Sequence, residues 1–248
     1  MKISIITATY NSASTVRDTL ASIAAQTYRP IEHIIVDGLS SDETLQIVRE
    51  FPHVNLTIAE KDSGIYDAMN KGILHATGEI IGILNSDDIY TSNTVIERVM
   101  KLFEDNTVDA VYGDLQYVEK NNLDRVVRTW KAGQFERNKF FYGWMPPHPS
   151  FFVRKEAYQK WGMFNLQLRS AADYEIMLRF LFRYNASVKY LPGVLVKMRV
   201  GGVSNNTLRN RLKANREDRL AWKLNNLNPK FFTLILKPLR KINQFLIR

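Results

Sequence analysis

The chain has 248 residues, of which 45% are hydrophobic and 11% aromatic, so it can bury the core of one large α/β domain. It contains no cysteine, which excludes disulfides, zinc–thiolate sites and thiol nucleophiles. The net charge of +9 is uneven: residues 1–198 carry 22 basic and 23 acidic side chains, whereas residues 199–248 carry 12 basic and two acidic ones. Because the body is nearly neutral, we expect no nucleic-acid partner.

The N-terminal segment becomes polar after a few apolar residues, which does not fit a signal peptide. No stretch reaches the roughly 20 apolar residues that a membrane-spanning helix needs. We therefore expect a cytoplasmic protein.

Short apolar runs alternate with amphipathic stretches through the first part of the chain. We expect strands at 3–7, 31–36, 54–58 and 80–84. We expect helices at 14–26, 42–51 and 64–75. This alternation predicts an α/β fold with a parallel sheet covered on both faces, and ligands then bind beyond the carboxyl ends of the strands. Polar clusters lie at three of those ends, at 7–11, 37–42 and 85–88.

The second part of the chain has a mixed pattern. A helix is expected at 93–103, a strand at 109–114 and further strands or a hairpin as far as Trp130. Residues 132–150 are rich in aromatic residues and proline, and a helix is expected at 171–184.

Asp87 and Asp88 follow an apolar strand. Two adjacent carboxylates at such a position repel each other and lose solvation, which a shared cation relieves. Magnesium or manganese suits these oxygen ligands, and Mg²⁺ commonly completes its shell with substrate phosphates. The alternative is that one aspartate only caps the next helix.

Five segments together resemble the inverting, GT-A-fold glycosyltransferases of family 2, which build bacterial surface polysaccharides. They are residues 7–11, 36–42, 62–72, 84–88 and 171–179. The resemblance covers about residues 3–205. It implies a Rossmann-like, mostly parallel central sheet flanked by helices. The implied catalytic domain is 1–205, with a nucleotide-sugar-binding half (1–115) and an acceptor-binding half (116–205), followed by a basic helical extension (206–248).

The resemblance also implies roles for individual residues. Those expected to contact the nucleotide-sugar donor are Thr7, Ala8 and Tyr10 at the base pocket, Asp37 on the base, Asp62 beside the nucleoside, and Asp87 on the ribose or sugar. Asp88 would bind Mg²⁺ or Mn²⁺ on the diphosphate. Family members often carry Asp at the position of Asn85, so this chain departs from the pattern there. Separately, Arg199 precedes two glycines and could stabilise the diphosphate leaving group; the alternative is an ordinary turn at the end of the core.

Asp173 matches the general base that deprotonates the acceptor hydroxyl, with Glu175 in support. The alternative function for Asp173 is to cap the helix that follows it. His148 and Trp144 are weaker candidates for contacts with the acceptor.

Residues 229–248 have an amphipathic, basic pattern: Phe232, Ile235, Leu239, Ile242 and Leu246 share one face. Such a helix can lie on an anionic membrane, which fits a lipid-linked or oligosaccharide acceptor and a peripheral location on the cytoplasmic face of the inner membrane. The alternative is packing on the catalytic body or on a second subunit of a homo-oligomer.

The expected function is transfer of a sugar, with a UDP-sugar as the favoured donor. The sequence leaves two alternative functions open. One is a sugar nucleotidyltransferase, although the loop after the first strand lacks the glycines of a phosphate loop. The other is a non-catalytic, membrane-attached scaffold of the same fold.

Overall fold

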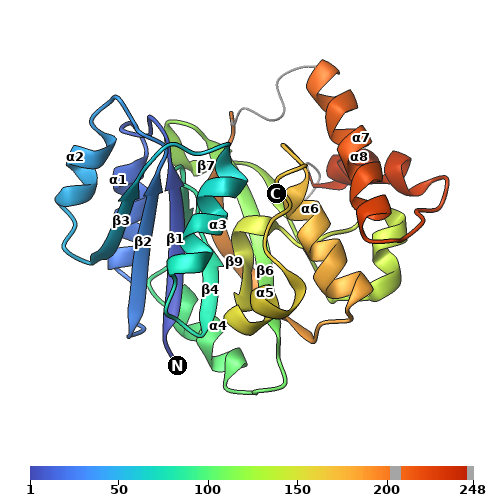
Figure 1. Cartoon of the computed structure of the whole chain (residues 1–248), viewed down its shortest axis with the longest axis horizontal. Coiled ribbons are helices and arrows are strands. Elements are labelled where there is room, and N and C mark those ends of the chain that lie inside the picture. The colour runs from blue at the N-terminus through green and yellow to red at the C-terminus, as the bar shows by residue number, and fades with distance from the viewer. Residues whose placement is uncertain (202–207, 245–248) are drawn as a thin grey trace.

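The structure is a computed structural model. It describes residues 1–201 and 208–244, except for the side chains of residues 208–214 and 241–243. The described residues form one α/β body around a curved sheet (Figure 1). The strands are β1 (Ile3–Thr9), β2 (Ile31–Asp37), β3 (Val54–Ala59), β4 (Ile80–Ile83), β5 (Asp88–Tyr90), β6 (Ala110–Glu119), β7 (Asn122–Trp130), β8 (Phe151–Arg154) and β9 (Val188–Arg199).

Helices connect and cover these strands. They are α1 (Val16–Ala24), α2 (Thr44–Arg49), α3 (Ile65–His75), α4 (Val95–Phe103), α5 (Lys155–Trp161), α6 (Ala172–Met177), α7 (Leu208–Leu224) and α8 (Thr233–Asn243), with short turns η1 (Arg137–Tyr142) and η2 (His148–Ser150). The helix expected at 171–184 consists of α6 and a π-helical continuation, η3 (Leu178–Arg183).

The order of the strands confirms the α/β class and corrects one detail. Among the described residues the sheet runs β3-β2-β1-β4-β8-β6-β9-β5, with β7 paired to β6. The first four strands are parallel, as the βαβ pattern predicts. Beyond them β8 runs antiparallel to both β4 and β6, so the sheet is mixed and not mostly parallel. The parallel half therefore ends where the βαβ repeats end.

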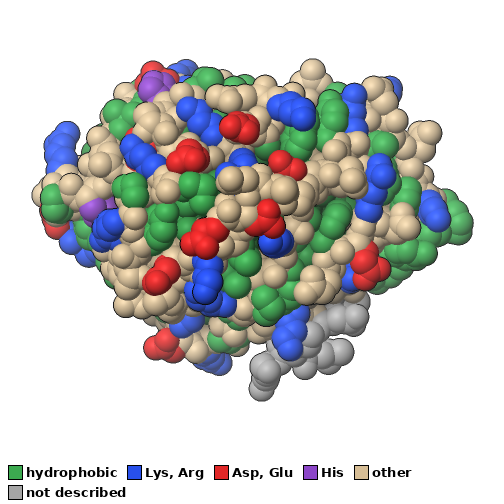
Figure 2. All heavy atoms as spheres, turned by 90° about the horizontal axis from the view of Figure 1, so that it is seen from below, with side chains coloured by type: hydrophobic (Ala, Val, Ile, Leu, Met, Phe, Trp, Pro, Cys, Tyr) green, Lys and Arg blue, Asp and Glu red, His purple; other side chains and the backbone are tan. Residues whose placement is uncertain are grey.

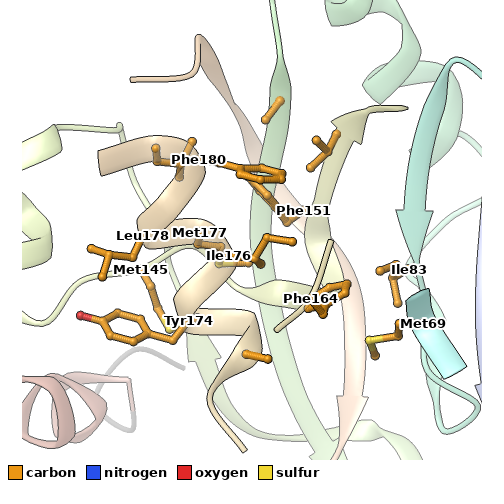
Figure 3. Packing of buried hydrophobic residues seen from close by; sticks show 14 of the residues in the cluster. Met69, Ile83, Met145, Phe151, Phe164, Tyr174, Ile176, Met177, Leu178 and Phe180 are labelled. Carbon is orange, nitrogen blue, oxygen red and sulfur yellow. The ribbon is translucent and has the colours of Figure 1, made fainter. Parts of the chain in front are cut away.

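The largest hydrophobic cluster joins the parallel half of the sheet to α6 and η3. Figure 3 shows Ile176 and Phe180 of this helix beside Phe151 on β8, and Phe164 between the helix and Ile83. Ile176 and Phe180 are buried. Because these side chains sit in a packed core, they fix the position of α6, the helix that carries Asp173.

The C-terminal helices α7 and α8 lie beside α6, at the end of the molecule opposite α1 and α2 (Figure 1). Trp222 of α7 is fully buried, and the ring of Phe232, just before α8, stacks on Tyr142 of η1. Packing on the body, one of the two expectations for this segment, is thus present. The expected domain boundary at residue 205 and residues 245–248 of the tail lie outside the described residues. No described helix is long and apolar enough to span a bilayer.

Candidate functional site

The polar loops after β1, β2 and β4 meet at one edge of the sheet, as their order predicts. Asn11 N–H donates to Ser40 Oγ at 2.8 Å, which joins the first loop to the second. The hydroxyls of Ser12 and Ser86 lie 2.8 Å apart, which joins the first loop to the third. The three loops therefore form one continuous polar surface at the carboxyl ends of parallel strands, where α/β proteins bind ligands.

Asp37 at the end of β2 is fully buried and accepts three hydrogen bonds. Its Oδ1 accepts from Ser40 N–H at 2.7 Å, and its Oδ2 accepts from the hydroxyls of Ser40 (2.6 Å) and Thr9 (2.7 Å). These bonds hold the second loop against the first. A carboxylate offers about four acceptor positions, so a contact with the base is compatible with these bonds and stays a prediction.

Asp62, Gly38 and Tyr10 form the open part of this edge. Asp62 Oδ1 accepts from Gly64 N–H at 2.9 Å, and its Oδ2 lies over Gly38. A Cβ at residue 38 would be 2.5 Å from that oxygen and 3.4 Å from the Tyr10 ring, so only glycine leaves room for the carboxylate. Tyr10 is 66% exposed. An aromatic face beside a carboxylate can stack on a base and accept from its N–H groups.

Thr7 and Ala8 of β1 are buried. The Thr7 hydroxyl lies 3.1 Å from His33 Nε2 in the interior, so its side chain does not face the open edge. A contact of these two residues with a base would therefore have to come from the backbone, and it stays a prediction.

Asp88 begins β5, and the next helix, α4, starts seven residues later after Thr94. The helix-capping alternative is therefore wrong for both Asp87 and Asp88. Asp88 is fully buried; its Oδ2 accepts from Asn85 Nδ2 at 3.0 Å. Asp88 Oδ1 and Asn85 Oδ1 are buried with no hydrogen-bond partner among the described residues. Buried oxygens normally have partners, so these two leave a place for a cation.

The pKa shifts of Asp87 and Asp88 agree with a place for a cation beside Asp88. Burial, followed by the charge of Asp87, raises the pKa of Asp88 well above its usual range. Burial also raises the pKa of Asp87, and the positive charge of Arg199 opposes that shift. Protein groups therefore compensate the two charges incompletely, and a divalent cation would stabilise the ionised pair. Among the described residues no group of three or more carboxylate or imidazole side chains could enclose a metal, so ligands from a substrate would have to complete the shell.

Arg199 lies beside the aspartate pair at the end of β9 and is 5% exposed. Its guanidinium donates to the backbone oxygens of Asp87 (2.8 Å) and Lys120 (3.0 Å) and pairs with the Asp18 carboxylate. Arg199 thereby ties α1 and the β6–β7 turn to the acidic loop. This positioning role was not expected from the sequence, and contact with a diphosphate stays a prediction.

Asp173 lies in the first turn of α6, after an N-cap at Ala171. Its Oδ1 accepts from the backbone N–H of Tyr174 at 2.8 Å and from the Tyr66 hydroxyl at 3.2 Å. Tyr66 belongs to α3, which begins directly after Asp62–Gly64. A half-buried carboxylate oriented by a tyrosine from the donor-side helix suits a general base better than a helix cap.

Two aromatic rings, those of Phe164 and Tyr66, connect His148 to Asp173. The His148 ring packs edge-on against Phe164, which stacks on Tyr66. Burial lowers the pKa of His148, and the negative charge of Asp173 partly opposes that shift. His148 therefore lies within electrostatic reach of Asp173, and its contact with an acceptor stays a prediction.

Trp144 lies in the core, which corrects its expected role as an acceptor contact. It is 4% exposed, its Nε1 donates to the Ala132 oxygen at 2.8 Å, and its ring packs against Tyr112 and Phe140. It is a core residue and presents no face to an acceptor. An aromatic-rich segment gives no sequence signal that separates core rings from exposed ones.

Helix α7 and Asn225, the residue just after it, hold the residues on either side of Asp173. Glu217 Oε2 accepts from Ser170 N–H (2.7 Å) and its hydroxyl (3.0 Å). Trp222 Nε1 donates to the Tyr174 hydroxyl at 2.9 Å. Asn225 Nδ2 donates to Glu175 Oε1 at 2.9 Å. Glu175 also pairs with Arg179 one turn along, which fits the supporting role expected for it.

The charges of both Asp88 and Asp173 act on Tyr117 of β6, which sequence reasoning missed. Burial raises the pKa of its phenol, the Arg128 guanidinium stacked 3.6 Å from its ring centre lowers it, and the charges of Asp88 and Asp173 both raise it. The two aspartates therefore lie within electrostatic reach of one side chain. The alternating pattern of β6 shows only that Tyr117 lies on one face of the strand, not which loops flank it.

This combination of fold and site has clear relatives. The family model described as "Glycosyl transferase family 2" matches residues 4–162. A "PGL/p-HBAD biosynthesis glycosyltransferase" of Mycobacterium bovis is 32% identical over 208 residues, which covers 82% of this chain and 78% of the relative. The chain belongs to glycosyltransferase family 2 and is a glycosyltransferase. The nucleotidyltransferase and scaffold alternatives are therefore set aside.

Solved structures agree on the fold. S. aureus TarS in complex with UDP-GlcNAc superposes with a TM-score of 0.69 at 20% identity, over 91% of this chain and 65% of that one. The mannosyltransferase PcManGT of Pyrobaculum calidifontis, in complex with GDP-Man and Mn²⁺, gives a TM-score of 0.66 at 21% identity, over 94% and 67%. At these identities the likeness establishes the GT-A fold.

Proposed function

We propose that this enzyme transfers a sugar, with inversion, from a nucleotide-diphosphate sugar to a hydroxyl group of a lipid-linked saccharide in polysaccharide biosynthesis. The observation that carries the proposal is the pair of buried oxygens, Asn85 Oδ1 and Asp88 Oδ1, that have no partner in the part of the chain the structure describes; the half-buried Asp173 complements it. The oxygens of Asn85 and Asp88 suit a cation on a diphosphate, and the carboxylate of Asp173 suits a general base.

The donor would lie along the edge formed by the first three loops. Tyr10 stacks on the base and Asp62 accepts from a base N–H, which favours a base with an imide or amide N–H such as uracil. A UDP-sugar is the favoured donor, because the structurally similar TarS binds UDP-GlcNAc. Asp87 contacts the ribose or the sugar.

Asn85 and Asp88 would hold Mg²⁺ or Mn²⁺. The bound cation would neutralise the negative charge that develops on the departing diphosphate. Asn85 supplies a neutral oxygen where other family members often have a carboxylate, so diphosphate oxygens provide the remaining ligands and negative charge. The structure of PcManGT with GDP-Man and Mn²⁺ supports a metal-dependent donor site of this kind.

Asp173 would accept the proton of the acceptor hydroxyl. The hydroxyl oxygen forms a bond to the anomeric carbon while the bond from that carbon to the diphosphate oxygen breaks, and the nucleoside diphosphate leaves with the bonding electrons. Attack opposite the leaving group inverts the anomeric centre. Tyr66 holds Asp173 in the orientation for this transfer, and His148 borders the acceptor side.

A direct test is release of nucleoside diphosphate from UDP-GlcNAc, UDP-glucose and GDP-mannose, with and without Mn²⁺. We expect one donor to be cleaved slowly by water, only with the metal, and not by Asp88→Asn. Equal metal-dependent turnover by Asp88→Asn would contradict the assignment of the metal ligand.

A further inference from the structure

Helix α8 has an inner face that packs on the body and an outer apolar face that the described residues leave exposed. On the inner face Thr233 and Leu234 are buried, and Lys237 Nζ lies 3.5 Å from the centre of the Tyr174 ring. The backbone of α8 at Lys237 passes so close to Gly143 that a Cβ on that glycine would be 2.4 Å from it. This face fixes α8 on the catalytic body.

The outer face exposes Phe231 (91%), Ile235 (60%) and Leu239 (49%). These residues are four apart, so they line one side of the helix and of the turn that leads into it. We call Phe231, Ile235 and Leu239 the outer stripe. Phe232, which the sequence pattern placed on the same face, instead stacks on Tyr142. Figure 2 shows hydrophobic side chains at the surface of the right-hand end of the molecule, the end where α7 and α8 lie in Figure 1.

The C-terminal segment that carries the outer stripe exposes more positive than negative charge. The exposed cations between residues 215 and 240 are Arg216, Arg219, Lys223, Lys230 and Arg240. The carboxylates in this range are Glu217 and Asp218. Glu217 accepts three hydrogen bonds from Arg169 and Ser170, and Asp218 pairs with Lys237 at 2.5 Å. Both carboxylates thus act inside the fold, and the surface keeps an excess of positive charge.

From this arrangement we infer that the outer stripe of α8 docks on an anionic phospholipid bilayer, with the cations of α7 and α8 at the headgroups. An apolar stripe flanked by lysine and arginine matches an interfacial helix. A second copy of the chain fits less well, because a two-fold interface would bring the same cations face to face.

This inference rests on the proposed function and adds an orientation to it. The inner face of α8 contacts Tyr174, the neighbour of Asp173. Docking through the outer stripe would therefore place α8 between the lipid surface and the base, which puts the base more than one helix diameter (about 10 Å) from the lipid. That distance suits an acceptor whose lipid is embedded in the bilayer and whose sugar projects from it.

The test is flotation of the full-length protein with vesicles of phosphatidylcholine alone and of phosphatidylcholine mixed in equal parts with phosphatidylglycerol. The test variant is the double substitution Ile235→Asn and Leu239→Asn, at exposed positions. The matched control is Leu56→Asn with Leu74→Asn, two exposed leucines of the donor half. Circular dichroism checks that each variant is folded.

We expect the wild type and the control to float with anionic vesicles only, and more weakly at high salt. The Ile235/Leu239 variant should lose at least about tenfold in partition coefficient. Equal flotation of this variant, no flotation of the wild type, or a dimer in light scattering that the variant abolishes would overturn the inference. Donor cleavage in solution should be the same in the variant, so failure of docking is distinguishable from failure of the proposed function.

Discussion

The donor side and the acceptor side of this site hold their aspartates in opposite ways. Asp88 is fully buried beside a second carboxylate, and one of its oxygens has no partner among the described residues. Asp173 is half-buried and is oriented by Tyr66, while α7 holds the residues around it. A buried, incompletely compensated carboxylate is suited to a cation, whereas a base must be exposed to its substrate and fixed in direction. The difference in burial and orientation supports the proposed division of roles between Asp88 and Asp173.

The largest expected effect is a fall in kcat when Asp173 is replaced, without the loss of nucleotide binding expected for a donor-site residue. Asp173→Asn keeps the shape of the side chain but removes the proton acceptor, so we predict that kcat falls about a thousandfold. Affinity for the nucleoside diphosphate should stay within a factor of about two, since Asp173 does not contact it in this account. Steady-state kinetics and calorimetry measure both. Asp124→Asn, at a side chain that is 95% exposed, is the matched control.

The next effect concerns the link from α3 to the base. Tyr66→Phe removes one hydrogen bond to Asp173, and we predict a fall in kcat of about tenfold with an unchanged KM for the donor. Tyr184→Phe, at an exposed ring, should change neither value. A rise in donor KM at constant kcat would mean that Tyr66 serves the donor side instead.

A smaller effect is expected at the open edge of the donor side. Gly38→Ala would displace the Asp62 carboxylate, and we predict that UDP binds about fivefold more weakly, a loss of about 1 kcal/mol. Asp62→Asn should weaken binding by a similar amount, because it alters the same group. If both substitutions act through Asp62, the double variant should be little worse than either one, which calorimetry can measure. Fully additive losses would contradict this explanation.

The smallest effect tests the support from α7. Glu217→Gln weakens the charge-assisted bonds to Ser170, and we predict a loss of about 1–2 kcal/mol in the free energy of unfolding and a fall in kcat of a few-fold. Urea denaturation measures the first quantity. Glu156→Gln on the exposed face of α5 should change stability by less than about 0.5 kcal/mol. An unchanged Glu217→Gln protein would show that α7 does not position the base.

The sequence predicts the structure best in the parallel half of the sheet, where each strand and helix follows from the residues within it. The loops at 7–11, 37–42 and 85–88 converge because parallel strands end at one edge of a sheet. Sequence alone could not decide whether Asp88 caps a helix, since strand β5 depends on pairing with Met198, more than a hundred residues away. The burial of Asp37 and Trp144 also depends on partners from other segments.

The acceptor side was harder to predict for the same reason. Tyr66 and Asp173 are 107 positions apart, and the bonds from α7 to Ser170 and Tyr174 span almost fifty. No periodicity within a window of ordinary length encodes such contacts. The mixed sheet has the same origin, because the direction of β8 is set by its two neighbours and not by its own four residues.

In the proposed mechanism Asp88 holds a metal on the donor diphosphate and Asp173 acts as the base. The most direct measurement is calorimetric binding of UDP, with and without Mn²⁺, to the wild type, Asp88→Asn and Asp173→Asn. We predict that Mn²⁺ strengthens binding to the wild type and to Asp173→Asn, but not to Asp88→Asn. Strengthening that persists in Asp88→Asn, or that is lost in Asp173→Asn, would contradict the division of roles.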